Sequence, residues 1–313
     1  MKKRDSHFFN IQDSVFKYVL IVIALTVIGL FATLFVLLII RSFPSLSTNG
    51  LGFLAGTVWD SNNAVFGALP AIAGTLVSAL IATLVAIPIS LGIAIYFTEY
   101  APTRARFVLS LFIDLLAAIP SVIYGIWGLW VISPLIKTYV QQPIVGSIGF
   151  IPIFAGPAYG LSIFLASLIL TIMVIPIISS LSIELLSRTP HSLKEGMVSL
   201  GATKWETVRH VGIPFAKLGI FAAIILGLGR ALGETMAVTM VIGNSYVWPF
   251  GSPSIFAPAT TITSKIATEL YEATGAVHVG ALIELGLTLL VITILVNSIS
   301  RLIIVRTHKR GSS

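Results

Sequence analysis

Residues 187–217 read "SRTPHSLKEGMVSLGATKWETVRHVGIPFAK", a basic segment that lies between two long apolar runs. The pair Thr189 and Pro190 is typical of a helix start, because proline is tolerated at the first helical position. Three apolar residues then recur at positions i, i+4 and i+7, namely Leu193, Met197 and Leu200. This spacing places them on one face of a helix. The first half of the segment therefore predicts a short amphipathic helix.

The second half of the segment predicts another short helix after a turn. Gly201 ends the first helix, because glycine takes the left-handed cap conformation at little cost. Thr203, with Glu206 three residues later, has the spacing of a capping box. An apolar face follows at Trp205, Val208 and Val211, and Pro214 opens the next apolar run. Two short amphipathic helices joined at a glycine either lie on a lipid surface or form a docking site for a partner protein.

The composition is that of an integral membrane protein. The chain has 313 residues, of which 56% are hydrophobic and only 10% are charged, and its mean hydropathy is +1.01. Soluble domains carry about a quarter charged residues. There is no cysteine, which excludes disulfides, thiolate metal sites and cysteine nucleophiles. The five histidines show no ligand-like spacing, so we expect no metal and no cofactor in this chain.

Six apolar runs are long enough to cross a bilayer, which takes about 20 helical residues: 18–40, 69–97, 107–132, 158–182, 216–242 and 279–300. The first run is too long for the core of a signal peptide, so we expect a retained transmembrane helix. Pro88, Pro120 and Pro176 fall inside the second, third and fourth runs, where we expect kinks. The sequence therefore predicts an all-α membrane fold with six transmembrane helices.

The distribution of lysine and arginine predicts the orientation. The N-terminus, the 98–106 loop, the 183–217 loop and the C-terminus hold four, two, five and four of these residues, whereas the opposite loops hold three. Because basic loops stay in the cytoplasm, we expect both termini to be cytoplasmic. The net charge of +7 is accordingly interpreted as membrane topology and not as nucleic-acid binding.

The predicted organisation has three parts. Residues 1–66 hold the N-terminus, the first span and the first outer loop, residues 67–301 hold the transmembrane core, and residues 302–313 form a basic tail. We expect the outer loops, 41–68, 133–157 and 243–278, to be irregular caps, with one short surface helix within 261–273.

The stretch "EGMVSLGATKWETVRHVGIP" (195–214) resembles the EAA loop of bacterial ABC importer permeases, a loop that lies within the 189–214 segment. The family pattern is Glu-Ala-Ala, three residues, Gly, nine residues, then Ile-x-Leu-Pro. This chain departs from it mainly at Gly196 and Met197, where the pattern has alanines. The resemblance implies helices that couple to an ATPase subunit, with contacts from Glu195, Gly201, Ala202, Trp205, Ile213 and Pro214. The chain has no phosphate-binding loop, so we expect that it is not an enzyme and that a partner binds ATP and Mg²⁺.

Four further stretches resemble the phosphate-uptake branch of that family, of the PstC type: "FLAGTVWD" (53–60), "FGALPAIAGTL" (66–76), "AAIPSVIYGIWGLW" (117–130) and "GLGRALGETMAV" (227–238). This resemblance implies a type I ABC importer transmembrane domain in the bacterial inner membrane, surrounded by lipid. It also implies a sister permease (PstA-like), an ATPase dimer (PstB-like) and a phosphate-binding protein outside the membrane (PstS-like).

The stretch "GLGRALGETMAV" places Arg230 at the middle of the fifth run and Glu234 one helical turn later, on the same face. An arginine there costs about 2.5–3.5 kcal/mol on insertion scales, so we expect the pair to face the bundle. Gly229 and Gly233 have the spacing that lets helices approach closely. We expect Arg230 and Glu234 to line an anion path, with weaker polar contacts from Thr235, Thr239 and Asn244.

Other interpretations of the same residues stay open. The pair could be an internal ion pair that only fixes helix packing. The chain could move another oxyanion, such as sulfate or molybdate, or be an ion channel or a membrane-embedded enzyme. Asp114 and Glu284, the other carboxylates within predicted spans, are expected to be interfacial or helix-pairing groups.

Overall fold

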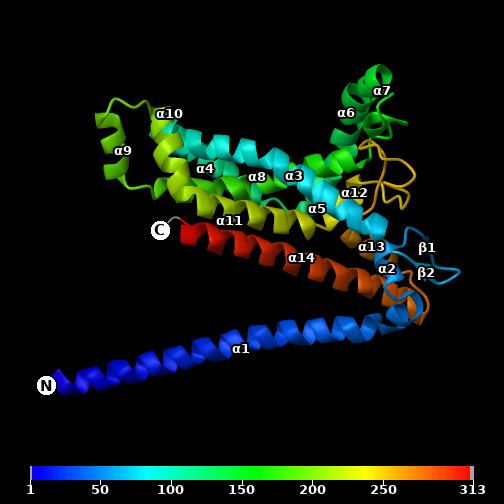
Figure 1. The fold of residues 1–313 in the computed structure, drawn as a ribbon, viewed down its shortest axis with the longest axis horizontal. Helices are drawn as coiled ribbons and strands as arrows, with labels where there is room; N and C mark the ends of the chain where they lie inside the picture. The colour runs from blue at the N-terminus through cyan, green and yellow to red at the C-terminus, as the bar shows by residue number, and fades with distance from the viewer. Residues whose placement is uncertain (1, 311–313) are drawn as a thin grey trace.

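The computed structural model describes the backbone of residues 2–310 and the side chains of residues 13 and 15–304. In this part of the chain, six helical segments are long and apolar enough to cross a membrane: Val15–Asn49, Leu69–Tyr100, Ser121–Ile148, Ile163–Ser187, Lys204–Leu232 and Ala276–Ile304. The prediction of an all-α membrane protein with six spans is therefore confirmed. Figure 1 shows the long helices running side by side between two ends of an elongated molecule.

The helices and strands follow one another in a fixed order. The first half contains α1 (Lys2–Asn49), α2 (Gly52–Ala55), β1 (Trp59–Asp60), β2 (Val65–Phe66), α3 (Leu69–Ile95), η1 (Tyr96–Tyr100), α4 (Thr103–Ala118), α5 (Ser121–Trp127), η2 (Gly128–Ile132), α6 (Ser133–Ile136), η3 (Lys137–Gln141), α7 (Gln142–Ile148) and η4 (Pro152–Phe154). The second half contains α8 (Ile163–Ser187), α9 (His191–Ser199), α10 (Lys204–Thr207), η5 (Val208–Gly212), α11 (Ile213–Leu232), α12 (Met236–Val241), α13 (Ile262–Glu269) and α14 (Ala276–Arg310).

The core lies where α8 packs between α3 and α11. Small residues on α3 face α8, among them Ala79, Ala82 and Ala86, all fully buried. They let the two backbones approach closely enough for hydrogen bonds between helices. The Thr171 hydroxyl donates to the Ala82 carbonyl at 3.3 Å, and the Ser90 hydroxyl donates to the Ile175 carbonyl at 3.2 Å. Close packing with polar cross-links therefore holds the centre together.

The first helix stands apart from this core. In Figure 1, α1 meets α14 at the end of the molecule that carries the β1–β2 hairpin and diverges from it toward the N-terminus. At the meeting point, Gly280 of α14 lies under α1, where an added Cβ would stand 3.1 Å from the Ser45 nitrogen. Most side chains of α1 from Val15 to Ile40 are exposed, which suits contact with lipid or with another subunit.

Two ends of the molecule can be distinguished. The α9 end carries α9, α10 and both ends of the described chain, whereas the hairpin end carries β1, β2 and α2 (Figure 1). In the hairpin, Trp59 pairs with Phe66 and Asp60 with Val65. The predicted short helix within 261–273 is present as α13, although its first residues are buried instead of lying on the surface.

The prediction of one span over 107–132 is wrong. The helix stops at Ala118, since Ile119 and Pro120 are extended with ψ angles of 126° and 139°. A residue before proline avoids the helical region because the proline ring clashes with it. Helix then resumes at Ser121 and continues to Ile148, so much of the expected irregular loop at 133–157 is helical. Pro88 and Pro176, in contrast, lie inside α3 and α8, which continue through them.

Two glycines of α11 test the packing of the core. A Cβ on Gly227 would lie 2.9 Å from side-chain carbons of Val174 and Ile178, whereas a Cβ on Gly229 would meet no described atom of another element within 4 Å. We expect Gly227→Ala to destabilise the protein by about 1–3 kcal/mol through overpacking. Gly229→Ala should instead be neutral or stabilising by about 0.4–1 kcal/mol. Thermal unfolding of the purified protein measures both, and equal effects would contradict the assigned packing.

Candidate functional site

The joint between α9 and α10 has the local structure that the sequence predicts. Gly201 adopts a positive φ of +85°, which glycine tolerates at a helix end. The Thr203 hydroxyl accepts from the Glu206 nitrogen at 3.3 Å, and the Glu206 carboxylate accepts from the Thr203 nitrogen at 2.8 Å. These reciprocal bonds form the predicted capping box. The α9–α10 turn is therefore built by its own sequence.

The sequence suggested a second short helix separate from the membrane span. The structure instead joins this helix to the span. Helix α10 passes through the π-helical turn η5 into α11, so that Lys204–Leu232 is one helical segment. The π-helical turn ends just before Pro214, which lies at the start of α11. Proline lacks an N–H and its ring clashes with the carbonyl four residues earlier, which shifts the hydrogen-bond pattern locally. A displacement of α10 therefore acts directly on α11.

The α9 end presents apolar side chains that the described chain leaves uncovered. Leu200 is 85% exposed, and Leu193, Val198 and Trp205 are at least half exposed. The same loop is tied to the bundle by polar contacts that the sequence did not reveal. Lys194 forms an ion pair with Glu99, and the Lys204 ammonium lies 5.8 Å from the centre of the Tyr100 ring. An anchored loop with an open apolar face is suited to receive another protein.

The residues predicted to contact an ATPase lie along this loop and at the start of the fifth span. Exposed members are Glu195, Gly201, Trp205 and Pro214, and half-buried members are Ala202 and Ile213.

The fifth span is interrupted at the stretch that carries its charges, so the prediction of a continuous helix over 216–242 is wrong. Helix α11 ends at Leu232 and α12 begins at Met236. Arg230 accordingly lies in the last turn of α11 and not at the middle of a helix. The break has a physical cause, because glycine is a poor helix former and the side chain of Glu234 competes for a main-chain donor. Its carboxylate accepts from the Ala237 nitrogen at 3.2 Å.

Arg230 and Glu234 form a loose ion pair with unequal exposure. The Arg230 Nη2 lies 3.7 Å from the Glu234 Oε2, beyond hydrogen-bond distance. The side chain of Glu234 is only 4% exposed, whereas that of Arg230 is 49% exposed. Among the described residues, the Arg230 guanidinium donates no hydrogen bond. Arg230 is therefore neutralised by a nearby charge while its donors stay available to a ligand.

The glycines beside this pair do not bring another helix close. An added Cβ on Gly229 would meet no described atom of another element within 4 Å, and one on Gly233 would meet only the Gly229 carbonyl at 3.6 Å. The expectation of close helix packing at these two glycines is therefore wrong. The space beside them keeps the guanidinium accessible.

The threonines predicted near the pair lie on α12 and the break before it. Thr239 donates its hydroxyl to the Thr235 carbonyl at 2.7 Å, so this group is engaged within its own helix. Asn244, with a positive φ of 52°, donates to the Thr239 carbonyl at 2.9 Å. The structure thus brings Arg230, Glu234 and Thr235 together and places Thr239 and Asn244 at the far end of α12.

Sequence reasoning missed the hydroxyl groups of the 260–264 segment. All residues of this segment are buried. The Thr263 hydroxyl donates to the Glu234 carbonyl at 2.8 Å. The Ile262 nitrogen donates to the Thr75 hydroxyl of α3 at 2.9 Å. The signal in the sequence was a run of hydroxyl residues, "TTITS", inside a loop expected to be a surface cap.

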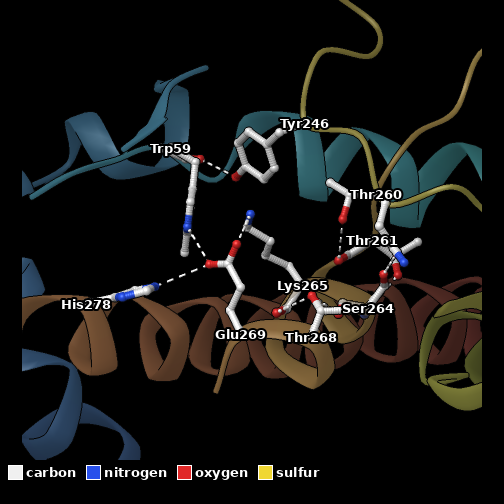
Figure 2. Close-up of polar contacts among 11 residues, drawn as sticks. Trp59, Tyr246, Thr260, Thr261, Ser264, Lys265, Thr268, Glu269 and His278 are labelled. Carbon is white, nitrogen blue, oxygen red and sulfur yellow. Dashed lines mark hydrogen bonds and ion pairs between the residues drawn. The ribbon is translucent and has the colours of Figure 1, made fainter. Parts of the chain in front are cut away.

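Next to this segment, five residues form what we call the Glu269 cluster: Trp59, Tyr246, Lys265, Glu269 and His278. Figure 2 shows Trp59, His278 and Lys265 pointing toward the Glu269 carboxylate from β1, α14 and α13. The Trp59 indole donates to Glu269 Oε2 at 2.8 Å, and the His278 Nε2 lies 3.2 Å from the same oxygen. Lys265 completes an ion pair with Glu269.

Aromatic rings enclose the lysine of this cluster. The Lys265 ammonium lies 5.0 Å from the centre of the Trp59 ring and 4.7 Å from that of Tyr246. Both distances fall within the range of cation–π attraction. Burial alone would raise the pKa of Glu269, but the hydrogen bond and charge of Lys265, with the His278 and Trp59 bonds, hold this pKa below its ordinary value of 4.5. The carboxylate therefore stays charged at neutral pH.

Asp114 and Glu284, the carboxylates that the sequence placed inside predicted spans, differ in their surroundings. Asp114 is exposed on α4. Glu284 of α14 is buried and interacts with Ser45 of α1, and one of its oxygens has no hydrogen-bond partner among the described residues. Glu284 therefore has the predicted helix-pairing position.

The Glu269 cluster predicts a pH-dependent contribution to stability. Because the pKa of Glu269 is lower in the folded protein, its stabilisation is present above pH 4.5 and is lost as the pH falls through the lowered value. We expect Glu269→Gln to destabilise the protein by about 1 kcal/mol at pH 7. Thermal unfolding at pH 7 and pH 4 should show a smaller difference from wild type at pH 4. Glu272→Gln, at an exposed position nearby, is the control, and a difference independent of pH would contradict the prediction.

Comparison with known proteins places these features in a family. Residues 86–309 match the family described as binding-protein-dependent transport system inner membrane component. Proteins named phosphate transport system permease protein PstC are 45% identical in Haemophilus influenzae (95% of this chain, 94% of the relative) and 42% identical in Mesorhizobium japonicum (96% and 93%). PstC 2 of Mycobacterium tuberculosis is 38% identical, covering 90% of this chain and 87% of its own length.

Solved structures agree on the fold. The inward-facing MetNI methionine ABC transporter matches with a TM-score of 0.53 and 18% identity, over 74% of this chain and 91% of the other. At that identity the likeness concerns the fold alone, which is that of an ABC importer transmembrane domain. With its six apolar spans and its PstC relatives, the chain belongs to the family of binding-protein-dependent transport system inner membrane components, as a multi-pass inner membrane permease of the PstC group.

Proposed function

We propose that the chain is a transmembrane subunit of an ATP-driven importer that moves inorganic phosphate across the bacterial inner membrane. The observation that carries this proposal is the half-exposed Arg230 beside the buried Glu234, at a break in the fifth span. Irregular backbone at membrane depth is tolerated where it is buried in protein or lines a water-filled path. The names of the PstC relatives support phosphate as the ion.

The chemistry of the pair suits a passing oxyanion. The planar guanidinium of Arg230 can bind two phosphate oxygens at once. An isolated arginine would hold the ion too tightly for release, and the Glu234 carboxylate 3.7 Å away weakens that hold. Glu234 can also accept a hydrogen bond from a protonated phosphate oxygen, which sulfate lacks near neutral pH. We place Thr235 and Thr239 along the same proposed path, beyond the pair.

Uptake measurements on the assembled transporter test the roles of both residues. We expect Arg230→Lys to lower phosphate uptake by about tenfold or more, because charge-assisted bidentate contacts are worth more than about 1.5 kcal/mol. Glu234→Gln should lower uptake by a similar factor, because the arginine would then hold the ion too tightly for release. Arg188→Lys and Glu184→Gln are matched controls, since they alter an exposed arginine–glutamate pair with the same spacing. Normal uptake by both test variants would leave the pair a packing role. Inhibition by excess sulfate or molybdate would instead indicate another oxyanion.

The α9 end is the proposed contact surface for the ATPase subunits. The chain holds no phosphate-binding loop, so ATP and Mg²⁺ would be bound by a separate PstB-like ATPase dimer. We place the exposed apolar side chains around Gly201 in that interface, on the cytoplasmic side together with both termini. A PstA-like permease would complete the membrane path, and a PstS-like protein would deliver phosphate at the hairpin end.

Copurification of the ATPase tests this contact. Leu200 is 85% exposed, so Leu200→Glu should leave folding intact while it places a charge in the interface. We expect the ATPase to be lost from the purified complex, because a buried unpaired charge is strongly unfavourable. Tyr271→Glu is the control, as Tyr271 is 96% exposed in the segment between α13 and α14. Full retention of the ATPase by Leu200→Glu would contradict the docking surface.

A further inference from the structure

The short helix α13 touches two regions that the sequence gives no reason to connect. Its first residues, from Ile262 to Ser264, are buried beside the break in the fifth span. Its later residues Lys265 and Glu269 belong to the Glu269 cluster (Figure 2). At 1.5 Å per residue, its eight residues span only about 12 Å. About two turns of helix therefore separate the neighbourhood of Glu234 from the hairpin end.

At the inner side, α13 supplies hydroxyl groups to the irregular backbone around α12. The Thr263 hydroxyl donates to the Glu234 carbonyl at 2.8 Å. The Ser264 hydroxyl donates to the Asn244 side-chain oxygen, and the Asn244 amide donates to the Thr239 carbonyl at 2.9 Å. Both ends of α12 are thus held by neighbouring residues of α13. Backbone carbonyls released by a helix break need such donors when they are buried.

At its other side, α13 is held by three separate segments. The Glu269 carboxylate binds Trp59 of the first loop and His278 of α14, while Lys265 packs between the rings of Trp59 and Tyr246. Lys265 follows Ser264 directly in the chain. A shift of the hairpin or of the start of α14 would therefore move the hydroxyls that hold the break.

We propose that Thr263 and Ser264 are positioning residues that set the place of Glu234 in the anion path, and that α13 transmits the position of the Glu269 cluster to them. This inference rests on the proposed role of Glu234. The hydroxyls do not touch the ion, since Thr263 and Ser264 act on the Glu234 carbonyl and on Asn244. Their contribution is to keep the Glu234 carboxylate near Arg230 while the surrounding helices move.

The first test compares variants of matched shape in phosphate uptake by the assembled transporter. Thr263→Val removes the hydroxyl with little change of volume, Thr263→Ser retains it, and Thr268→Val removes a hydroxyl that binds only within α13. We expect Thr263→Val to lower the maximal uptake rate by about fivefold to tenfold, as the loss of one net hydrogen bond predicts. Thr263→Ser and Thr268→Val should stay near wild type. In a Glu234→Gln background, Thr263→Val should have no further effect.

A second test reads the position of the break without transport. Because the chain has no cysteine, a spin label on Met236→Cys, at the exposed start of α12, reports the mobility of the break alone. We expect Thr263→Val and Glu269→Gln both to raise the mobility of the label, and Thr268→Val to leave it unchanged. Unchanged mobility with Glu269→Gln would overturn the transmission through α13.

The outcomes separate this inference from the proposed function. Wild-type uptake by Thr263→Val, or an effect that is additive with Glu234→Gln, would overturn the positioning role while the role of Glu234 stands. An equal loss in Thr263→Val and Thr263→Ser would overturn it too, because the hydroxyl would then be irrelevant. Wild-type uptake by Glu234→Gln alone would overturn both.

Discussion

The Glu234 carboxylate, buried within a largely apolar segment, is the constraint on which the arrangement of the fifth span depends. An unpaired charge in such surroundings is strongly unfavourable, so it needs donors and a counter-charge. The break between α11 and α12 provides a donor, the Ala237 nitrogen, and Arg230 provides the counter-charge. A continuous helix would have used the Ala237 nitrogen in its own ladder. The interruption of the span is therefore what allows the charge to be there.

The interruption in turn requires support from the rest of the chain. Helix α12 has only six residues, too few to be stable alone. It is fixed by α5, where Gly125 allows Ala237 and Met240 to come close, and by the 260–264 segment. The segment itself is anchored on α3 through Thr75. The rigid centre formed by α3 and α8 thus serves as the frame against which a short, irregular element is held.

Local sequence patterns predicted local structure well. They did not predict contacts between residues that are distant in the sequence. The capping box at Thr203 and Glu206 and the glycine joint at Gly201 depend on residues within a few positions, and both are present. The break at Gly233 could not be predicted from hydropathy, because hydropathy measures side-chain polarity and contains no information about backbone hydrogen bonds. Thr263 meets Glu234 across 29 residues, and Trp59 meets Glu269 across 210, separations that no periodicity encodes. The fold class was predictable from the sequence, whereas the residues that support Glu234 and Glu269 from distant segments were not.

The pairing of α1 with α14 has a consequence for biosynthesis. These are the first and the last of the described spans, and their backbones come close at Gly280. During translation α1 is synthesised long before α14. The exposed apolar surface of α1 suits an independent helix in the bilayer until α14 is inserted. The closing contact forms only after the C-terminal helix has been inserted. A chain truncated before α14 would therefore lack the contact at Gly280 that holds the first helix against the last one.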